Sequence, residues 1–148
     1  MLRHETSRYY CVVTFPIING MRSVEFGNPG KSRDKILHFL LEGNKRATAG
    51  TLQNDYIDEN EPIEHVGERL AVLDNDMKHI ATIEVTKVET VRFIDVPDEF
   101  ALAEAEGDLS GDDFRESHFE FWTSCGYPIN DDTPVVCVYF DLVEDLRA

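Results

Sequence analysis

Hydrophobic positions recur along the chain with two different periods, and each period predicts a different kind of element. From Asp34 onward, leucine and isoleucine recur at the three-to-four spacing of one buried helical face. Gly43 stands where a helix commonly ends, so we expect this first helix to stop just before Lys45. Its apolar positions are Ile36, Leu37, Leu40 and Leu41.

Two further helices are predicted in the second half of the chain. Pro97, with acidic residues in the turn after it, indicates a short helix running to about Glu104. Ser110 is a suitable N-cap for a longer helix that carries Trp122 on its buried stripe and ends at Gly126.

Alternation with a period of two predicts strands in the other segments. Residues 69–73 and 79–86 flank a turn at residues 74–76 and predict a hairpin, and residues 90–94 predict a further strand. Residues 134–143 alternate throughout and predict a strand with one face in the core.

The N-terminal part also contains a strand-like segment. Residues 9–18 are largely apolar, and Pro16 suggests an edge position or a strand end. Residues 24–33 are rich in turn-forming residues and predict a loop. Because helices do not alternate regularly with strands, the fold class is α+β, with a curved or closed sheet.

Composition restricts the chain to one domain and narrows its partners. The 148 residues are 42% hydrophobic, enough for one core. Three cysteines without paired spacing suggest reduced thiols in a cytoplasmic protein. No apolar run is long enough for a membrane span. The net charge of -15 argues against a long footprint on RNA or DNA, but not against a nucleoside, a short strand or one phosphate.

The most informative stretch for chemistry is residues 43–50, which follow the first helix. Gly43, Lys45, Arg46 and Thr48 combine a flexible turn, cations and a hydroxyl. Such a loop suits an anion, or a threonine activated by lysine for attack on a carbonyl. The alternative is a helix cap followed by a solvated lysine.

A second candidate site is the acidic group Glu104, Glu106 and Asp108. Packed carboxylates raise one another's pKa, so one of them can act as a general acid or base near neutral pH. The alternative is a solvated acidic turn. The spacing of these residues from His118 matches no standard ligand motif, so no metal is expected, and no cofactor fingerprint is present.

Three residues of the last predicted helix form a third candidate. Arg115, His118 and Trp122 are spaced so that one helix face carries all three, a suitable platform for a base and its phosphate. Alternatively, Trp122 belongs to the core, Arg115 pairs with a nearby acid, and His118 is a satisfied interior polar group.

Taken together and in order, several motifs resemble ASCH-domain proteins over roughly residues 24–144. The matching residues are Phe26-Gly27, the leucine-rich first helix, Gly43-x-Lys45-x-x-Thr48 with Ala49 and Tyr56, Glu61-Pro62, Val66-Gly67, Val72-Leu73-Asp74, Phe100, residues 104–108, Ser110, Phe114-Arg115, His118 and residues 134–137. The division that follows is an N-terminal extension, residues 1–23, and an ASCH domain, residues 24–148.

The resemblance implies a PUA-like β-barrel with flanking helices and a cleft lined by the Gly-x-Lys loop. Members of the family are proposed to bind RNA or nucleosides, and a smaller relative is an amidohydrolase acting on acetylated cytidine. The catalytic Lys, Thr and Glu of that enzyme match Lys45, Thr48 and Glu106. This sequence has Gly50 where the motif of that enzyme has arginine.

Our leading hypothesis is therefore a cleft that binds a nucleoside or a short RNA. The expected catalytic residues are Lys45, Thr48 and Glu106, and the expected substrate-binding residues are Gly43, Arg46, Asp108, Arg115, His118 and Trp122. The alternatives are an amidohydrolase on N-acylated nucleosides, a ribonuclease, and an acidic protein-interaction module. We also expect that the chain can form a homodimer.

Overall fold

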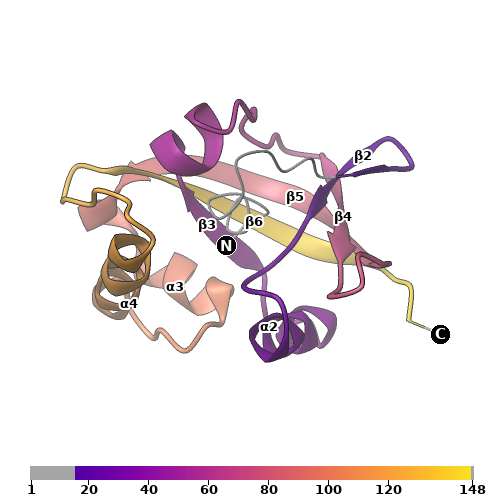
Figure 1. Cartoon of the computed structure of the whole chain (residues 1–148). Helices are drawn as coiled ribbons and strands as arrows, with labels where there is room; N and C mark the ends of the chain where they lie inside the picture. The colour runs from indigo at the N-terminus through magenta and orange to yellow at the C-terminus, as the bar shows by residue number, and fades with distance from the viewer. Residues whose placement is uncertain (1–15, 148) are drawn as a thin grey trace.

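The computed structural model describes residues 16–147, which form one six-stranded sheet with helices packed against it (Figure 1). The strand order is β1-β2-β4-β5-β6-β3. Neighbouring strands are antiparallel, except that β2 runs parallel to β4. The strands are β1 (Ile17–Ile18), β2 (Met21–Val24), β3 (Ala47–Thr51), β4 (Arg69–Leu73), β5 (His79–Arg92) and β6 (Pro134–Asp145).

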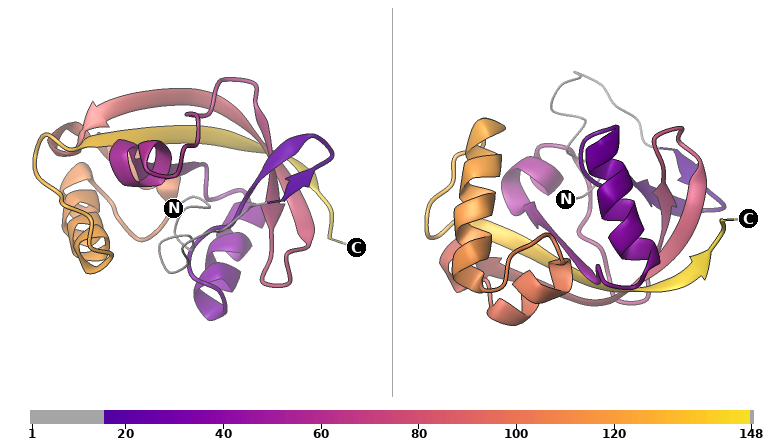
Figure 2. Two further views of the ribbon diagram at one scale, coloured as in Figure 1. Left: turned by 45° about the horizontal axis from the view of Figure 1, so that its top comes forward. Right: turned by 90° about the horizontal axis from the view of Figure 1, so that it is seen from below.

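The helical elements connect these strands. They are α2 (Lys31–Leu41), the π-helix η1 (Leu52–Ile57), the 3-10 helix η2 (Phe93–Asp95), α3 (Asp98–Glu104) and α4 (Gly111–Ser124). In Figure 1 and in both views of Figure 2, α3 and α4 lie side by side, apart from α2. Among the described residues, no helix is both long enough and apolar enough to span a membrane.

The sheet is strongly curved but it is not closed. Figure 2 shows β5 and β6 bending together along the molecule, and the pairing of β5 with its neighbours contains bulges, which increase twist and bend. Within the described residues, β1 and β3 are the two edges of the sheet. The predicted β-barrel is therefore wrong in its closure, because β1 and β3 do not pair with each other and α2 packs Leu37 and Leu40 into the interior instead.

The alternation in β6 places its side chains in two separate cores. Val136 and Val138 face the concave interior with α2, whereas Val135 and Cys137 face α3 and α4 on the opposite side. Strand β3 pairs with this part of β6 and shares both faces, so Ala47 and Ala49 pack towards α3 and α4. Because Thr48 is opposite Val138, its side chain is directed to the other face.

Several predicted elements are confirmed. The hairpin of β4 and β5 is present, and so are the short helix after Pro97 and the strand that begins at Pro134. The Ser110 hydroxyl accepts a hydrogen bond from the backbone N–H of Asp113, which makes it the expected N-cap of α4. Gly43 follows the end of α2 with φ 81°, a backbone conformation that favours glycine.

Other boundaries differ from the prediction. Helix α2 begins at Lys31 instead of Asp34, since Gly30 has φ 100° and its N–H donates to the Asn75 side chain, so the chain turns earlier. Residues 79–86 and 90–92 belong to one strand, β5, which has a bulge between Val85 and Lys87, whereas Phe93 and Ile94 already belong to η2. Residues 47–50 are not a loop but part of β3. Most of the predicted strand at residues 9–18 lies outside the described residues.

Candidate functional site

Two adjoining clefts lie beside the α3–α4 loop, and Glu106 lines both. The larger has a volume of about 300 Å³ and lies between α2 and residues 105–107. Its walls are Ser32, Lys35, Ile36, Phe39, Lys45, Ala105, Glu106 and Gly107. The smaller has a volume of about 180 Å³ and is lined by Glu106, Asp108, Ser117, His118 and Phe121.

Lys45 is the fixed cation at the base of the larger cleft. Its residue surface is only 1% exposed, and its ammonium donates to the carbonyl oxygens of Ala47 and Glu104, at 2.8 and 3.0 Å. The same nitrogen lies 3.5 Å from Glu106 Oε2 and 5.8 Å from the centre of the Phe26 ring. The lysine is therefore held in place by two carbonyls, one carboxylate and one aromatic face, and is not a solvated surface residue.

Glu106 remains a carboxylate despite its surroundings. Burial by itself raises the pKa of this group, but the positive charges of Lys45 and His118 outweigh burial and lower the pKa to about 2. Its side chain is 20% exposed, so part of it is accessible from the clefts. A permanent carboxylate at this position can accept hydrogen bonds from a ligand and does not supply protons near neutral pH.

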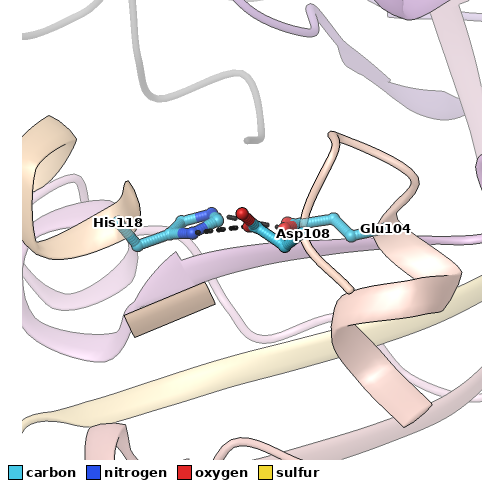
Figure 3. A group of neighbouring side chains, drawn as sticks. All are labelled: Glu104, Asp108 and His118. Carbon is cyan, nitrogen blue, oxygen red and sulfur yellow. Dashed lines mark ion pairs between the residues drawn. The ribbon is translucent and has the colours of Figure 1, made fainter. Parts of the chain in front are cut away.

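His118, which lines the smaller cleft, faces the carboxylates of Asp108 and Glu104 (Figure 3). Its Nε2 is 3.3 Å from Glu104 Oε1, and its Nδ1 is 3.7 Å from Asp108 Oδ2. The Glu104 side chain is completely buried, whereas that of Asp108 is 12% exposed. The three residues come from different places, since Glu104 ends α3, Asp108 lies in the loop, and His118 is in α4.

The orientation of the His118 ring is fixed by its own helix. The ring stacks on Phe114, with centroids 3.7 Å apart, and Nδ1 lies 3.0 Å from the Phe114 carbonyl oxygen. Because a carbonyl oxygen only accepts, Nδ1 carries the proton of this bond. Burial lowers the pKa of His118, but the charges of Glu104 and Glu106 raise it by more, so the net pKa is raised.

Thr48 does not line either cleft. It is 1% exposed, and β3 directs its side chain into the concave core opposite Val138. Gly50, which takes the place of an arginine in the amidohydrolase motif, lies against η1. A Cβ at Gly50 would approach atoms of Asp55 and Tyr56 at 3.2 Å, tighter than ordinary side-chain contacts. Packing against η1 thus accounts for glycine at this position.

Four other predicted site residues lie away from the clefts. Gly43 is at the end of α2, and Arg46 is an exposed residue whose guanidinium pairs with Asp141 at 2.9 Å. Arg115 donates to the carbonyl oxygens of Ile94 and Val96 and pairs with Asp112, so it fastens α4 to the preceding segment. Trp122 is 1% exposed and belongs to the core beside α3. The platform of Arg115, His118 and Trp122 is therefore not formed.

The clefts also include residues that the sequence argument did not select. Ser32, Lys35, Ile36 and Phe39 form the wall contributed by α2. Ile36 and Phe39 are only half-buried although they are apolar. The sequence could have pointed to them only through their spacing, because they lie three residues apart on the edge of the buried helical stripe. A partly exposed apolar edge is common on amphipathic helices, so this spacing alone does not indicate a binding site.

Comparison with known proteins gives a family and a fold. A family model for the ASCH domain matches residues 22–144. A crystal structure of a protein from Enterococcus faecalis V583 is similar, with a TM-score of 0.70 and 28% identity, covering 82% of this chain and 75% of that one. A crystal structure of an ASCH domain from Lactobacillus crispatus JV V101 has a TM-score of 0.69 and 25% identity, covering 95% and 93% of the two chains. None of the curated proteins compared matches the sequence. Because the family model spans most of the chain, the protein belongs to the ASCH domain family.

Proposed function

We propose that this ASCH-domain protein binds a single nucleoside, free or at one position of a short RNA strand, in the larger cleft. The observation that carries the proposal is the combination of side chains at this cleft. Phe39 and Ile36 offer half-buried apolar surface, Lys35 is an exposed cation, and Glu106 is a carboxylate beside buried Lys45. An aromatic face with a few convergent polar groups is the usual composition of a small-molecule site.

The chemistry of each wall suits a different part of a nucleotide. Phe39 supports stacking of the base, which is tolerant of sequence. Glu106 accepts hydrogen bonds from an exocyclic amine, as acidic side chains do from the amino group of cytosine. Lys35 suits one phosphate. We therefore infer a preference for a base that carries an exocyclic amine.

The charge of the whole protein supports a small ligand over a long strand. A net charge of -15 repels a polyanion, and nucleic-acid affinity depends on the number of phosphates that cations neutralise. Lys35 and Lys45 are the cations that line the larger cleft, and Lys45 is already paired with Glu106. A ligand with one or no phosphate fits this balance better than an extended RNA.

The test is calorimetric titration of the full chain with cytidine, cytidine monophosphate and uridine. We expect Phe39→Ala to weaken binding of both cytosine ligands by about 1–3 kcal/mol, the usual contribution of one base stacked on an aromatic side chain. Lys35→Met should weaken binding of the monophosphate and leave the nucleoside unchanged. Lys78→Met, which removes an exposed lysine from the β4–β5 turn, is the matched control. Equal binding by Phe39→Ala and the wild type would remove the proposed base site.

Hydrolysis of N-acylated nucleosides is a second candidate function. It is favoured by the 3.5 Å approach of Lys45 and Glu106, the residues that match two catalytic positions of the acetylcytidine enzyme. The buried position of Thr48 is the main difficulty, because its hydroxyl has to reach the substrate carbonyl. Turnover that is lost in both Lys45→Ala and Thr48→Val would support an amidohydrolase. Absence of turnover with every acylated nucleoside would leave binding alone.

A further inference from the structure

Three potential metal ligands, two of which line the smaller cleft, lie together in an arrangement that the sequence spacing does not reveal. Glu104, Asp108 and His118 each offer one ligand atom, and these atoms lie within 4.8 Å of one another (Figure 3). The distance from His118 Nε2 to Glu104 Oε1 is 3.3 Å. Two atoms that each lie about 2.1 Å from a tetrahedral metal ion are about 3.4 Å apart. The pair is therefore already spaced for chelation.

An independent observation concerns hydrogen bonding in this cleft. Both carboxylate oxygens of Glu104 and the Nε2 of His118 are buried and have no hydrogen-bond partner among the described residues. The two side chains are 0% and 5% exposed. A buried carboxylate without donors is costly, so such a group calls for a specific cation. Glu104 Oε1 and His118 Nε2 are 3.3 Å apart, so one cation bound to both atoms would satisfy them together.

The backbone of α4 prepares His118 for this role. Its Nδ1 proton is directed to the Phe114 carbonyl at 3.0 Å, which leaves the Nε2 lone pair facing Glu104. Histidines that bind metals commonly donate their other ring N–H to a backbone carbonyl or a carboxylate, which fixes the tautomer and the ring plane. Ser117 supports the third ligand, since its hydroxyl donates to Asp108 Oδ2 at 2.9 Å.

Charge balance in the two clefts also favours a divalent ion. Apart from the exposed Lys35, one cation, Lys45, stands beside three carboxylates at the two clefts, those of Glu104, Glu106 and Asp108, so two negative charges remain among these four groups. An imidazolium at His118 would reduce this surplus to one. A divalent cation on a neutral imidazole would remove it completely. Buried charges are tolerated when they are paired or coordinate a metal, and the second arrangement pairs all of them.

We propose that Glu104, Asp108 and His118 bind one divalent transition-metal ion of the zinc class. A ligand set of one imidazole and two carboxylates suits zinc, and three protein ligands leave a fourth position for water or another small ligand. Two of the ligands, Asp108 and His118, line the smaller cleft together with Glu106 and Ser117. The site goes beyond the proposed nucleoside binding, which uses the wall formed by α2.

Zinc itself is the probe for the test. The full chain, freed of metal with a chelator, is titrated with Zn²⁺ in competition with a chromophoric indicator, and we expect about one ion per chain. Asp108→Asn should weaken this binding at least about tenfold, since even loss of a group that supports a ligand costs this much. Glu104→Gln should have the same effect. The control Asp76→Asn removes one acidic charge from the exposed β4–β5 turn and should leave affinity unchanged.

Cobalt provides a second measurement that does not depend on activity. Co²⁺ in a four-coordinate site gives strong visible absorption, and we expect this signal in the wild type and not in Glu104→Gln. Circular dichroism establishes that both variants fold. Zinc binding that is equally tight in the wild type, Asp108→Asn and Glu104→Gln would place the ion elsewhere and overturn the proposal. Absence of zinc binding would also overturn the proposal and would identify the cluster as an ion pair of His118 with Glu104.

Discussion

Asp55 should make the protein less stable as the pH rises, and Asp55→Asn should remove this effect. The carboxyl lies in η1 and is buried, with its Oδ2 accepting from the backbone N–H of Thr51 at 2.7 Å and its Oδ1 from the Tyr127 hydroxyl at 3.2 Å. Burial raises its pKa, the hydrogen bonds from Thr51 and Tyr127 only partly offset this, and the result is about 6.

The direction of the effect follows from proton binding in the two states. Between the ordinary pKa of 3.8 and about 6, the folded protein keeps a proton that the unfolded chain has lost. The free energy of unfolding therefore falls as the pH rises through this window. A shift of about two pKa units corresponds to about 3 kcal/mol, of which about 2 kcal/mol falls between about pH 4 and about pH 7.

Asparagine keeps the shape and both hydrogen bonds without the charge. Its carbonyl oxygen accepts from Thr51, and its amide donates to the Tyr127 oxygen. We measure urea unfolding of the wild type, Asp55→Asn and the exposed control Asp76→Asn across this pH range. The free energy of unfolding of Asp55→Asn minus that of the wild type should increase by about 2 kcal/mol from about pH 4 to about pH 7. Parallel pH profiles for Asp55→Asn and the wild type would refute the reasoning.

Three further substitutions test the contacts around the clefts by urea unfolding. Gly27→Ala should cost about 1–2 kcal/mol, because Gly27 has φ 65° and a Cβ would meet Ile36 Cδ1 at 2.6 Å; an unchanged unfolding midpoint would contradict this. Arg33→Met should cost about 3–5 kcal/mol, because the buried guanidinium pairs with a carboxylate and donates to two carbonyls; a loss below about 1 kcal/mol would show that solvent replaces these contacts. Lys45→Met should also cost about 3 kcal/mol, and Glu106→Gln should recover part of the loss; strict additivity in the double mutant would contradict the ion pair.

The elements that follow from local sequence are the ones that sequence analysis predicts well. Helix α4 begins at its Ser110 cap, and β6 alternates over its first half, because both signals depend only on residues close in the chain. The start of α2 depends instead on Asn75 in the distant β4–β5 turn, and the short strand β2 is fixed by pairing with β4. Such long-range partners leave no periodic pattern in the sequence.

The candidate site shows the same division. Lys45, Glu106, Asp108 and His118 are selected from motif positions, and the fold places them at the two clefts. Phe39 is missed because its place in the cleft wall depends on which edge of α2 is left uncovered by the rest of the fold. Conversely, Trp122 is predicted to join a binding platform but belongs to the core. An aromatic residue at helical spacing fits core packing and base stacking equally well, so the sequence pattern does not distinguish the two roles.

Glu106 is the residue on which the two proposals meet. It lines both clefts, and its carboxylate is stabilised by the positive charges of Lys45 and His118. A ligand in the larger cleft that donates hydrogen bonds to Glu106 draws on the same negative potential that attracts a cation to the smaller cleft. A divalent ion at Glu104, Asp108 and His118 would neutralise the surplus charge near Lys35 and so reduce repulsion of a phosphate. The acidic cluster therefore has opposite effects on the two parts of a nucleotide, because it attracts the amine of the base and repels the phosphate. A metal ion bound to the cluster would reduce the repulsion of the phosphate.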